Sequence, residues 1–277
     1  NTSGIPVDVI NAVTGDKDAV QLTLAHNGEF GFTLTLTAPV GTENKGLWAN
    51  LYRYDEDAGE MIFETAARVG ADGNAALEFT HASQYAIVLD KKSHELPFTD
   101  VDTGDWFQTA VEYVYRHDVM NGTSATTFEP HVTLSRAMVA QILYNLEGQP
   151  AVTGESNFVD ANSHWAANAI AWAKQTGVVV GYEGNMFKPE KAVTREELAQ
   201  MLYNYANYRG ITLPVLGDLS QFPDGNKVSS WAQTAMKWAP GQQVINGYED
   251  NTLRPGGSTT RAEAASMIMG IAAMLLK

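Results

Sequence analysis

The fold is decided by the stretch Val193-Thr194-Arg195-Glu196-Glu197, which has the residue types of a helix start. Two related stretches keep the same order: Thr260-Arg261-Ala262-Glu263 and, in a weaker form, Ser135-Arg136-Ala137-Met138. Each motif arginine lies thirty residues after a tryptophan, and a glycine and a proline follow each tryptophan by sixteen and twenty-four residues. The tryptophans are Trp106, Trp165 and Trp231, the glycines Gly122, Gly181 and Gly247, and the prolines Pro130, Pro189 and Pro255. Three landmarks in register predict a threefold repeat in the C-terminal two thirds of the chain.

The composition limits the class of protein. With 277 residues, of which 44% are hydrophobic, the chain has room for two modest domains, or for one domain and a repeat array. Its net charge of -14 argues against a nucleic-acid partner, because phosphate binding requires clustered Lys and Arg. The absence of cysteine removes disulfides, cysteine-type zinc sites and thiol catalysis. No apolar run approaches the length of a membrane-spanning helix, so we expect no membrane insertion.

Residues 1–92 have the pattern of β-structure. Residues 21–24 and 31–37 alternate apolar and polar side chains, and Asn27-Gly28 between them is a pair that a type I′ hairpin turn favours. Further strands are expected at residues 47–54, 60–67, 75–80 and 85–89. Short strands at this spacing predict a small antiparallel β-sandwich of the immunoglobulin-like (Ig-like) kind. The polar segment that ends at Pro97 predicts a linker over residues 93–97.

The repeats are expected to span residues 98–150, 151–210 and 211–277, each with a helix, a turn-rich loop and a second helix. Each repeat opens with a Phe-x-Asp motif, whose aspartates are Asp100, Asp160 and Asp224. The pair Pro240-Gly241 is expected to end the first helix of the third copy early. No single copy can bury its apolar faces alone, so the predicted fold is α+β, with a β-domain followed by three helical repeats that pack together.

The threonine and the glutamate of the motif have a structural explanation. Thr194 with Glu197, and Thr260 with Glu263, have the spacing of a capping box, in which hydroxyl and carboxylate satisfy free backbone N–H groups. Met138 stands at the glutamate position of the first copy. That helix start is therefore expected to be weaker, by roughly 0.5–2 kcal/mol.

The motif arginine is not explained by capping. At the first helical position a cation faces the positive end of the helix dipole, at a cost on the order of 0.3–1 kcal/mol. One interpretation pairs each arginine with an internal carboxylate, for which the aspartates of the Phe-x-Asp motifs are the candidates. The other places an anionic ligand over the helix N-terminus, beside the guanidinium group. The two are compatible, and the spacing leaves both open.

The tryptophans and glycines of the repeats also have two interpretations each. The tryptophans are expected to be core residues, because they are large apolar residues on the buried side of a helix, and stacking of an exposed indole on a sugar is the alternative. The glycines are expected to have a conformational role, and contact of their backbone amides with a polar ligand is the alternative.

Together these motifs resemble three tandem S-layer homology (SLH) domains. The matching features are Phe-x-Asp followed by Trp, the Gly-to-Pro segments 122–130 and 181–189, and a Thr-Arg-Ala-Glu signature, which the third copy keeps best. The resemblance covers residues 98–277 and leaves residues 1–92 outside it. It implies an all-α-dominated, pseudo-threefold bundle with grooves between neighbouring copies.

The resemblance also implies a function. SLH domains anchor exported proteins non-covalently to the bacterial cell wall by binding secondary cell wall polysaccharide, commonly its terminal pyruvylated N-acetylmannosamine. The carboxylate of the pyruvate fits the hypothesis of an anionic ligand. The expected ligand-binding residues are then the motif arginines, tryptophans, aspartates and glycines: Arg136, Arg195, Arg261, Trp106, Trp165, Trp231, Asp100, Asp160, Asp224, Gly122, Gly181 and Gly247. We expect an extracellular location at the cell wall or cell surface, with a signal peptide absent from this chain.

Two other functions compete with anchoring. Self-assembly into a surface lattice would use an exposed β-edge of the N-terminal domain. A wall hydrolase would need its catalytic unit in residues 1–92, and the chain has no His-Glu-x-x-His or Gly-x-Ser-x-Gly motif. We therefore predict a protein that is not an enzyme and has no catalytic residues, cofactor or metal site. Its predicted partner is cell wall polysaccharide, with self-association as the alternative and with no nucleic acid.

Overall fold

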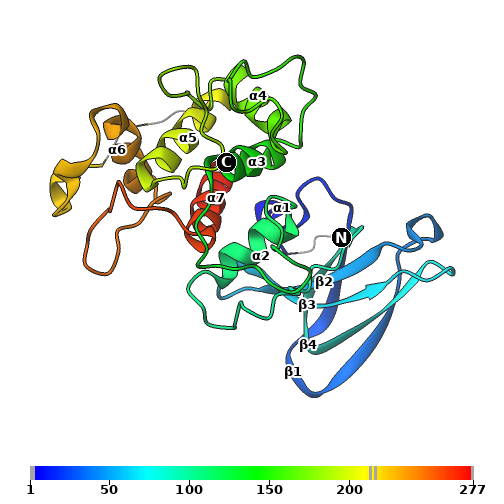
Figure 1. Ribbon diagram of the computed structural model, residues 1–277. Coiled ribbons are helices and arrows are strands. Elements are labelled where there is room, and N and C mark those ends of the chain that lie inside the picture. The colour runs from blue at the N-terminus through cyan, green and yellow to red at the C-terminus, as the bar shows by residue number, and fades with distance from the viewer. Residues whose placement is uncertain (1–3, 212–213, 215–216, 276–277) are drawn as a thin grey trace. The chain divides into compact units, whose positions relative to one another are not determined.

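The structure is a computed structural model that describes residues 4–211, 214 and 217–275. It divides into two compact units, unit 1 (Asn1–Pro97) and unit 2 (Phe98–Lys277) (Figure 1). Unit 1 contains a β-sheet, and unit 2 contains the helical repeats. Within the described ranges, no helix combines the length and the apolar character that a membrane span requires.

Unit 1 is an antiparallel sheet with one short helix. Helix α1 (Val7–Thr14) precedes the four strands β1 (Ala19–Pro39), β2 (Trp48–Asp55), β3 (Glu60–Arg68) and β4 (Asn74–Asp90), and a 3-10 turn η1 (Thr42–Asn44) follows β1. The strand order is β1-β4-β2-β3, and each neighbouring pair is antiparallel. The antiparallel sheet predicted from the sequence is confirmed. The described residues form one hydrogen-bonded sheet, whereas a sandwich has two.

The hairpin predicted at Asn27-Gly28 is wrong. Strand β1 continues through this pair, and β4 is likewise one strand where the sequence predicts two. The two strands pair on both sides of a bend, where β1 has extra residues between Thr23 and Gly28 and between Glu29 and Leu34. These residues form bulges, which let the strand follow a longer path around the bend. The positive φ of Gly28, 121°, therefore serves the bend and not a hairpin turn.

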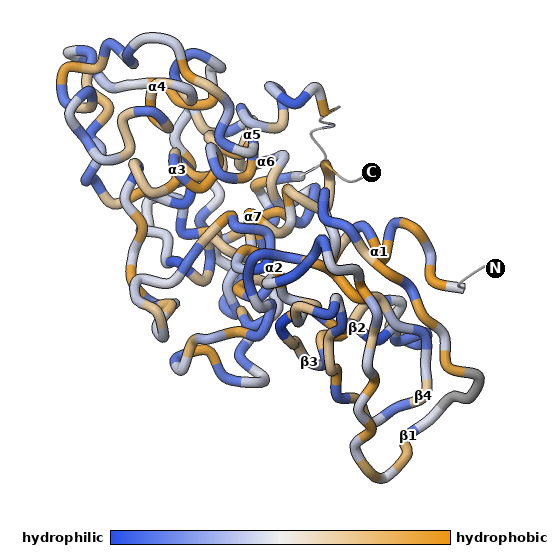
Figure 2. Tube along the Cα trace, turned by 90° about the vertical axis from the view of Figure 1, so that its right-hand side faces the viewer, coloured by the Kyte–Doolittle hydropathy of each residue, from blue (hydrophilic) through white to orange (hydrophobic). Residues whose placement is uncertain are grey.

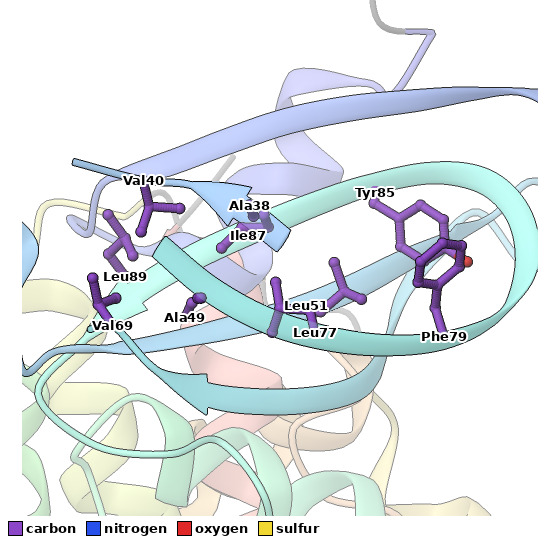
Figure 3. Packing of buried hydrophobic residues seen from close by; sticks show 11 residues of the cluster. Ala38, Val40, Ala49, Leu51, Val69, Leu77, Phe79, Tyr85, Ile87 and Leu89 are labelled. Atoms are coloured by element: carbon purple, nitrogen blue, oxygen red, sulfur yellow. The ribbon is translucent and has the colours of Figure 1, made fainter. Parts of the chain in front are cut away.

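The bend creates the core of unit 1. Figure 3 shows β4 turning back on itself beside Phe79 and Tyr85. In the second half of β1 the leucines Leu34 and Leu36 are partly buried and the threonines beside them are exposed, and Figure 2 shows the same alternation in hydropathy along the strand. Each large side chain buried here contributes about 1.5–3 kcal/mol. Both halves of the bent sheet supply the buried cluster: Ala38, Val40, Ala49, Leu51, Val69, Ala75, Leu77, Phe79, Tyr85, Ile87 and Leu89.

Unit 2 repeats a helix, a loop and a second helix three times. The first helices are α2 (Gln108–Arg116), α4 (Ala167–Gln175) and α6 (Gln233–Gly241), and the second helices are α3 (Arg136–Leu146), α5 (Arg195–Tyr208) and α7 (Arg261–Leu275). The third copy also has the 3-10 turns η2 (Leu219–Gln221), η3 (Gly225–Lys227) and η4 (Ser230–Ala232). Every second helix begins at a motif arginine, as the capping pattern predicts.

The three copies are joined in a ring. Helix α3 packs against α4, α5 against α6, and α7 of the third copy against α2 of the first. Backbone hydrogen bonds before the motifs follow the same cycle. The N–H of Leu134 donates to Thr259 O (3.0 Å), that of Thr259 to Val193 O (3.0 Å), and that of Val193 to Leu134 O (2.9 Å). Each copy thus contacts both others, which is the packing that a single amphipathic copy requires.

Pro240 does not shorten the first helix of the third copy, so that prediction is wrong. Helix α6 extends over nine residues, the same length as α2 and α4. Pro240 is the penultimate residue of the helix, where only Gly241 follows it. A proline at the end of a helix interrupts few subsequent hydrogen bonds, so the helix keeps its length.

Candidate functional site

The motif arginines are buried braces between neighbouring copies. Arg136, Arg195 and Arg261 are 4%, 3% and 8% exposed. Each Nε donates to a backbone carbonyl oxygen of the next copy in the ring: Phe187 (2.9 Å), Leu253 (2.9 Å) and Phe128 (2.7 Å), respectively. Each Nη2 donates to a second carbonyl of that copy: Val180 (3.2 Å), Asn246 (3.1 Å) and Asn121 (2.7 Å). These contacts explain why an arginine stands at an otherwise unfavourable helix start.

The aspartates of the Phe-x-Asp motifs have a different role within their own copies. Each accepts two successive backbone N–H groups at 2.7–2.8 Å, as Asp160 does from Phe187 and Lys188. The second donor of each pair has a positive φ, 58° at Lys188, so the carboxylate stabilises an unfavourable backbone conformation. Burial alone would raise the pKa of Asp160, but these hydrogen bonds outweigh it and lower the pKa. Among the described residues, no ion pair joins these aspartates to the motif arginines.

The carboxylates that pair with motif arginines are the motif glutamates. Nη1 of Arg136 lies 3.6 Å from Oε1 of Glu197, and Nη1 of Arg195 lies 3.3 Å from Oε1 of Glu263. The interpretation of an internal carboxylate partner is therefore right for these two arginines, but the partner differs from the predicted aspartate. The same glutamates close the predicted capping boxes with Thr194 and Thr260.

A tyrosine completes each arginine–glutamate pair. The hydroxyl groups of Tyr182 and Tyr248 donate to Glu197 and Glu263, and the guanidinium of Arg136 lies 4.7 Å from the Tyr182 ring centroid. Burial would raise the pKa of Glu197, but hydrogen bonds from Lys191 and Tyr182 outweigh it and lower the pKa. Burial and the bond to Glu197 raise the pKa of Tyr182. Glu197 is thus held ionised between a cation and a phenol.

Two pockets open beside these pairs. Pocket A, of about 480 Å³, is lined by Arg136, Tyr182, Glu197, Gln200, Asn204 and Trp231, among others. Pocket B, of about 650 Å³, is lined by Arg195, Tyr248, Glu249, Arg254, Glu263 and Trp106, among others. Each pocket combines an arginine of one copy, a tyrosine and glutamate of the next copy, and a tryptophan of the third.

The interpretation of the tryptophans as core residues is wrong. Trp106, Trp165 and Trp231 are 64%, 62% and 54% exposed. The residue after each of them, Phe107, Ala166 or Ala232, is buried instead. The first helices begin two residues after the tryptophans, which places the indoles outside the buried side of the helix. Two of these indoles line the pockets, where an aromatic face can stack on a sugar ring.

The repeat glycines occupy positions of close approach. A Cβ at Gly122 would lie 2.4 Å from Ser124 O, and a Cβ at Gly181 would lie 2.3 Å from the Phe158 ring. At Gly247 the closest approach is 3.3 Å, to the Phe222 ring. These close approaches support the conformational interpretation, and Gly181 and Gly247 also line pockets A and B.

Several pocket residues were not identified from the sequence. Tyr182 and Tyr248 directly follow the repeat glycines in copies two and three, so their shared position was a usable signal. Gln200 and Asn204 stand at the positions of Gln141 and Asn145 in copy one, and in both copies the glutamine donates to the asparagine. Glu249 shares its position with Glu183 of copy two, which was the same kind of signal, whereas Arg254 carried none, because Glu129 and Lys188 stand at its position in the other copies.

Comparisons with known proteins agree with this architecture. The model of the S-layer homology domain family matches residues 97–138, 157–199 and 221–265. The chain is 30% identical over 65% of its length to an endoglucanase of Bacillus sp. (strain KSM-635). It is 33% identical over 56% to the surface-layer 125 kDa protein of Lysinibacillus sphaericus, and 31% over 54% to a cellulosome-anchoring protein of Acetivibrio thermocellus.

The chain spans only 19%, 13% and 34% of the lengths of these three relatives. The matched segments each contain a Phe-x-Asp motif, an exposed tryptophan and a motif arginine. They coincide with the copies whose helices and arginine braces form unit 2. The chain therefore contains three tandem S-layer homology domains, as its repeated motifs predict.

Proposed function

We propose that this chain anchors an exported protein non-covalently to the bacterial cell wall by binding secondary cell wall polysaccharide. Its location is then extracellular, at the cell wall or cell surface. The observation that supports the proposal best is the composition of pockets A and B. Each offers an exposed indole for stacking, amide, hydroxyl or carboxylate groups for hydrogen bonds, and a buried arginine. The names of the surface-layer and cellulosome-anchoring relatives agree with this function.

The proposed ligand is the pyruvylated N-acetylmannosamine end of the polymer, which carries one carboxylate. The proposed binding residues are the motif arginines, the exposed tryptophans and the glycines, and the aspartates act by shaping the loops. The ring of backbone hydrogen bonds through Leu134, Thr259 and Val193 supports a pseudo-threefold bundle with one groove per junction. Unit 1, with its bent sheet, is proposed as an Ig-like spacer or display element.

The chain is proposed to have no catalytic activity of its own. One relative is named an endoglucanase, but this chain covers 19% of it, and the matched segment extends over 65% of this chain. Among the described residues, no group of three or more His, Asp or Glu side chains forms a metal site. Catalysis in that relative is therefore attributed to its other parts.

Binding to purified wall polysaccharide tests the anchoring proposal. Trp106→Ala and Trp231→Ala each remove an exposed pocket indole, and Phe32→Ala removes an exposed aromatic in unit 1 as a control. We expect each tryptophan variant to weaken binding about two- to tenfold, which is the range of an aromatic stacking contact. Failure of the unmodified chain to bind the polymer, or equal binding by all variants, would overturn the proposal.

Self-assembly into a surface lattice is the second candidate. Strands β1 and β3 are the two edges of the sheet in unit 1, and each pairs with one neighbour only. Such edges can add a strand from another copy. Sedimentation of the chain over a range of concentrations distinguishes the two functions, because a monomer at all concentrations contradicts lattice assembly and leaves anchoring unaffected.

A further inference from the structure

The three motif arginines share their backbone contacts but differ in one partner. Nη1 of Arg136 faces Glu197, and Nη1 of Arg195 faces Glu263. By the same repeat correspondence, the residue that faces Arg261 is Met138. Among the residues that the structure describes, the guanidinium is therefore paired with a carboxylate at two junctions and not at the third.

Arg261 is more than nine-tenths buried and has an unused donor group. Its Nε and Nη2 donate to Phe128 O and Asn121 O, both at 2.7 Å. Within the part of the chain that the structure describes, its Nη1 has no hydrogen-bond partner and no carboxylate forms an ion pair with it. Asp100 and Glu129 act on it only at longer range. A buried cation without a paired anion is costly, so binding of an external anion is most favourable at this arginine.

The position of Nη1 follows from the contacts that all three junctions share. Nε and Nη2 of each arginine are fixed by carbonyls at equivalent positions of the next copy, so Nη1 must point toward the equivalent third position. At the first two junctions that position is a glutamate lining a pocket. Met138 is 37% exposed, and Trp165, the counterpart of the pocket tryptophans, is 62% exposed. The two side chains that border this position are therefore open to solvent.

We propose that the carboxylate of an acidic wall saccharide binds at Nη1 of Arg261, beside Met138, in preference to the other two motif arginines. This inference rests on the proposed function and assigns the anionic end of the ligand to one junction. A carboxylate that approached Arg136 or Arg195 would meet Glu197 or Glu263, and like charges repel. Pockets A and B then bind the uncharged sugars of the polymer.

The residue that determines this preference is Met138. Met138→Glu places a carboxylate where the ligand carboxylate would bind, and Met138→Gln is a control of the same length without charge. The probes are sodium pyruvate and the uncharged methyl pyruvate. Binding is followed by ¹⁵N NMR of the arginine Nε–H groups, with the Arg261 signal assigned from its loss in Arg261→Lys.

We expect pyruvate to shift the Arg261 signal saturably and methyl pyruvate to leave it unchanged. The dissociation constant should rise about tenfold or more in Met138→Glu, since like-charge juxtaposition is strongly unfavourable, and stay near its original value in Met138→Gln. Shifts of the Arg136 or Arg195 signals at lower pyruvate concentrations would overturn the inference, as would equal affinities in the Glu and Gln variants.

The failure of this inference can be separated from failure of the proposed function. If wall polysaccharide binds the unmodified chain but leaves the Arg261 signal in place, the polymer site exists and only the assignment of the carboxylate is wrong. If the polymer does not bind at all, the anchoring proposal fails whatever pyruvate does.

Discussion

Units 1 and 2 both bury polar groups, but they use them differently. In unit 2 a buried arginine recurs at every junction between copies and joins two carbonyls of the next copy. In unit 1 the buried groups of Asn50, Asp90 and His94 form one cluster at the end of β4, beside the apolar core of the bent sheet. The polar contacts of unit 2 therefore assemble the fold, whereas those of unit 1 fix one local segment.

The largest loss of stability is expected when a junction between two copies of unit 2 is broken. Arg195→Met leaves Glu263 and the carbonyls of Leu253 and Asn246 without their cation. Removing one partner of a buried ion pair costs about 3–5 kcal/mol, so the free energy of unfolding should fall by that amount. Chemical denaturation followed by circular dichroism measures it. Arg254→Met removes an exposed pair with Asp250 and should change stability very little.

A smaller and more local effect is expected in unit 1. Asn50 accepts the N–H of His94 at 2.7 Å and donates to the carbonyls of Val88 and Lys92 at 3.3 Å. Asn50→Ala leaves a buried N–H unsatisfied, which costs about 1–3 kcal/mol. Hydrogen exchange should show the loss of protection at amides of β2 and β4. Equal loss at amides of α3 or α5 would contradict the local role of this cluster.

The difference between local contacts and contacts that join distant parts of the chain explains how much could be predicted from the sequence. The motif Thr194-Arg195 predicted a helix start because capping is local chemistry, and the second helices begin there in all three copies. The partner of Arg195 was not predictable, because Glu263 is 68 residues away and reaches it only through the packing of the copies. The predicted partner Asp160 instead holds two amides of its own copy.

Other local patterns were harder to interpret. Asn27-Gly28 favours a hairpin locally, but the pairing of β1 with β4 on both sides of the bend overrides that preference. Trp165 was assigned to the core from its size, but the helix begins two residues later and the indole faces outward. The cluster of Asn50 and His94 had no sequence signal, since it depends on hydrogen bonds between residues 38–44 positions apart.

Acidification should affect unit 1 through Asp90. Burial would raise the pKa of Asp90, but its contact with His94 Nε2 at 2.8 Å and the charge of Lys17 outweigh it and lower the pKa. A lowered pKa means that the ionised carboxyl stabilises the folded state above the ordinary carboxyl value of about 4. That stability is lost as the pH falls through the lowered value. In Asp90→Asn the free energy of unfolding should depend less on pH below about 4. If the variant loses as much stability in acid as the unmodified chain, the prediction is wrong.

The smallest change in stability is expected at the start of α3, where copy one has Met138 and the other two copies have a glutamate. Ser135 already accepts the N–H of Met138 at 3.3 Å, but no carboxylate of the described residues returns a bond to the Ser135 N–H. Met138→Glu should complete the capping box and raise the free energy of unfolding by about 0.3–1.5 kcal/mol, with part of the gain from pairing with Arg261. Met138→Gln can close the same box without charge. If the two variants differ in free energy of unfolding and the difference disappears at high salt, that difference measures the ionic contribution. If neither variant is more stable than the unmodified chain, the serine alone caps α3.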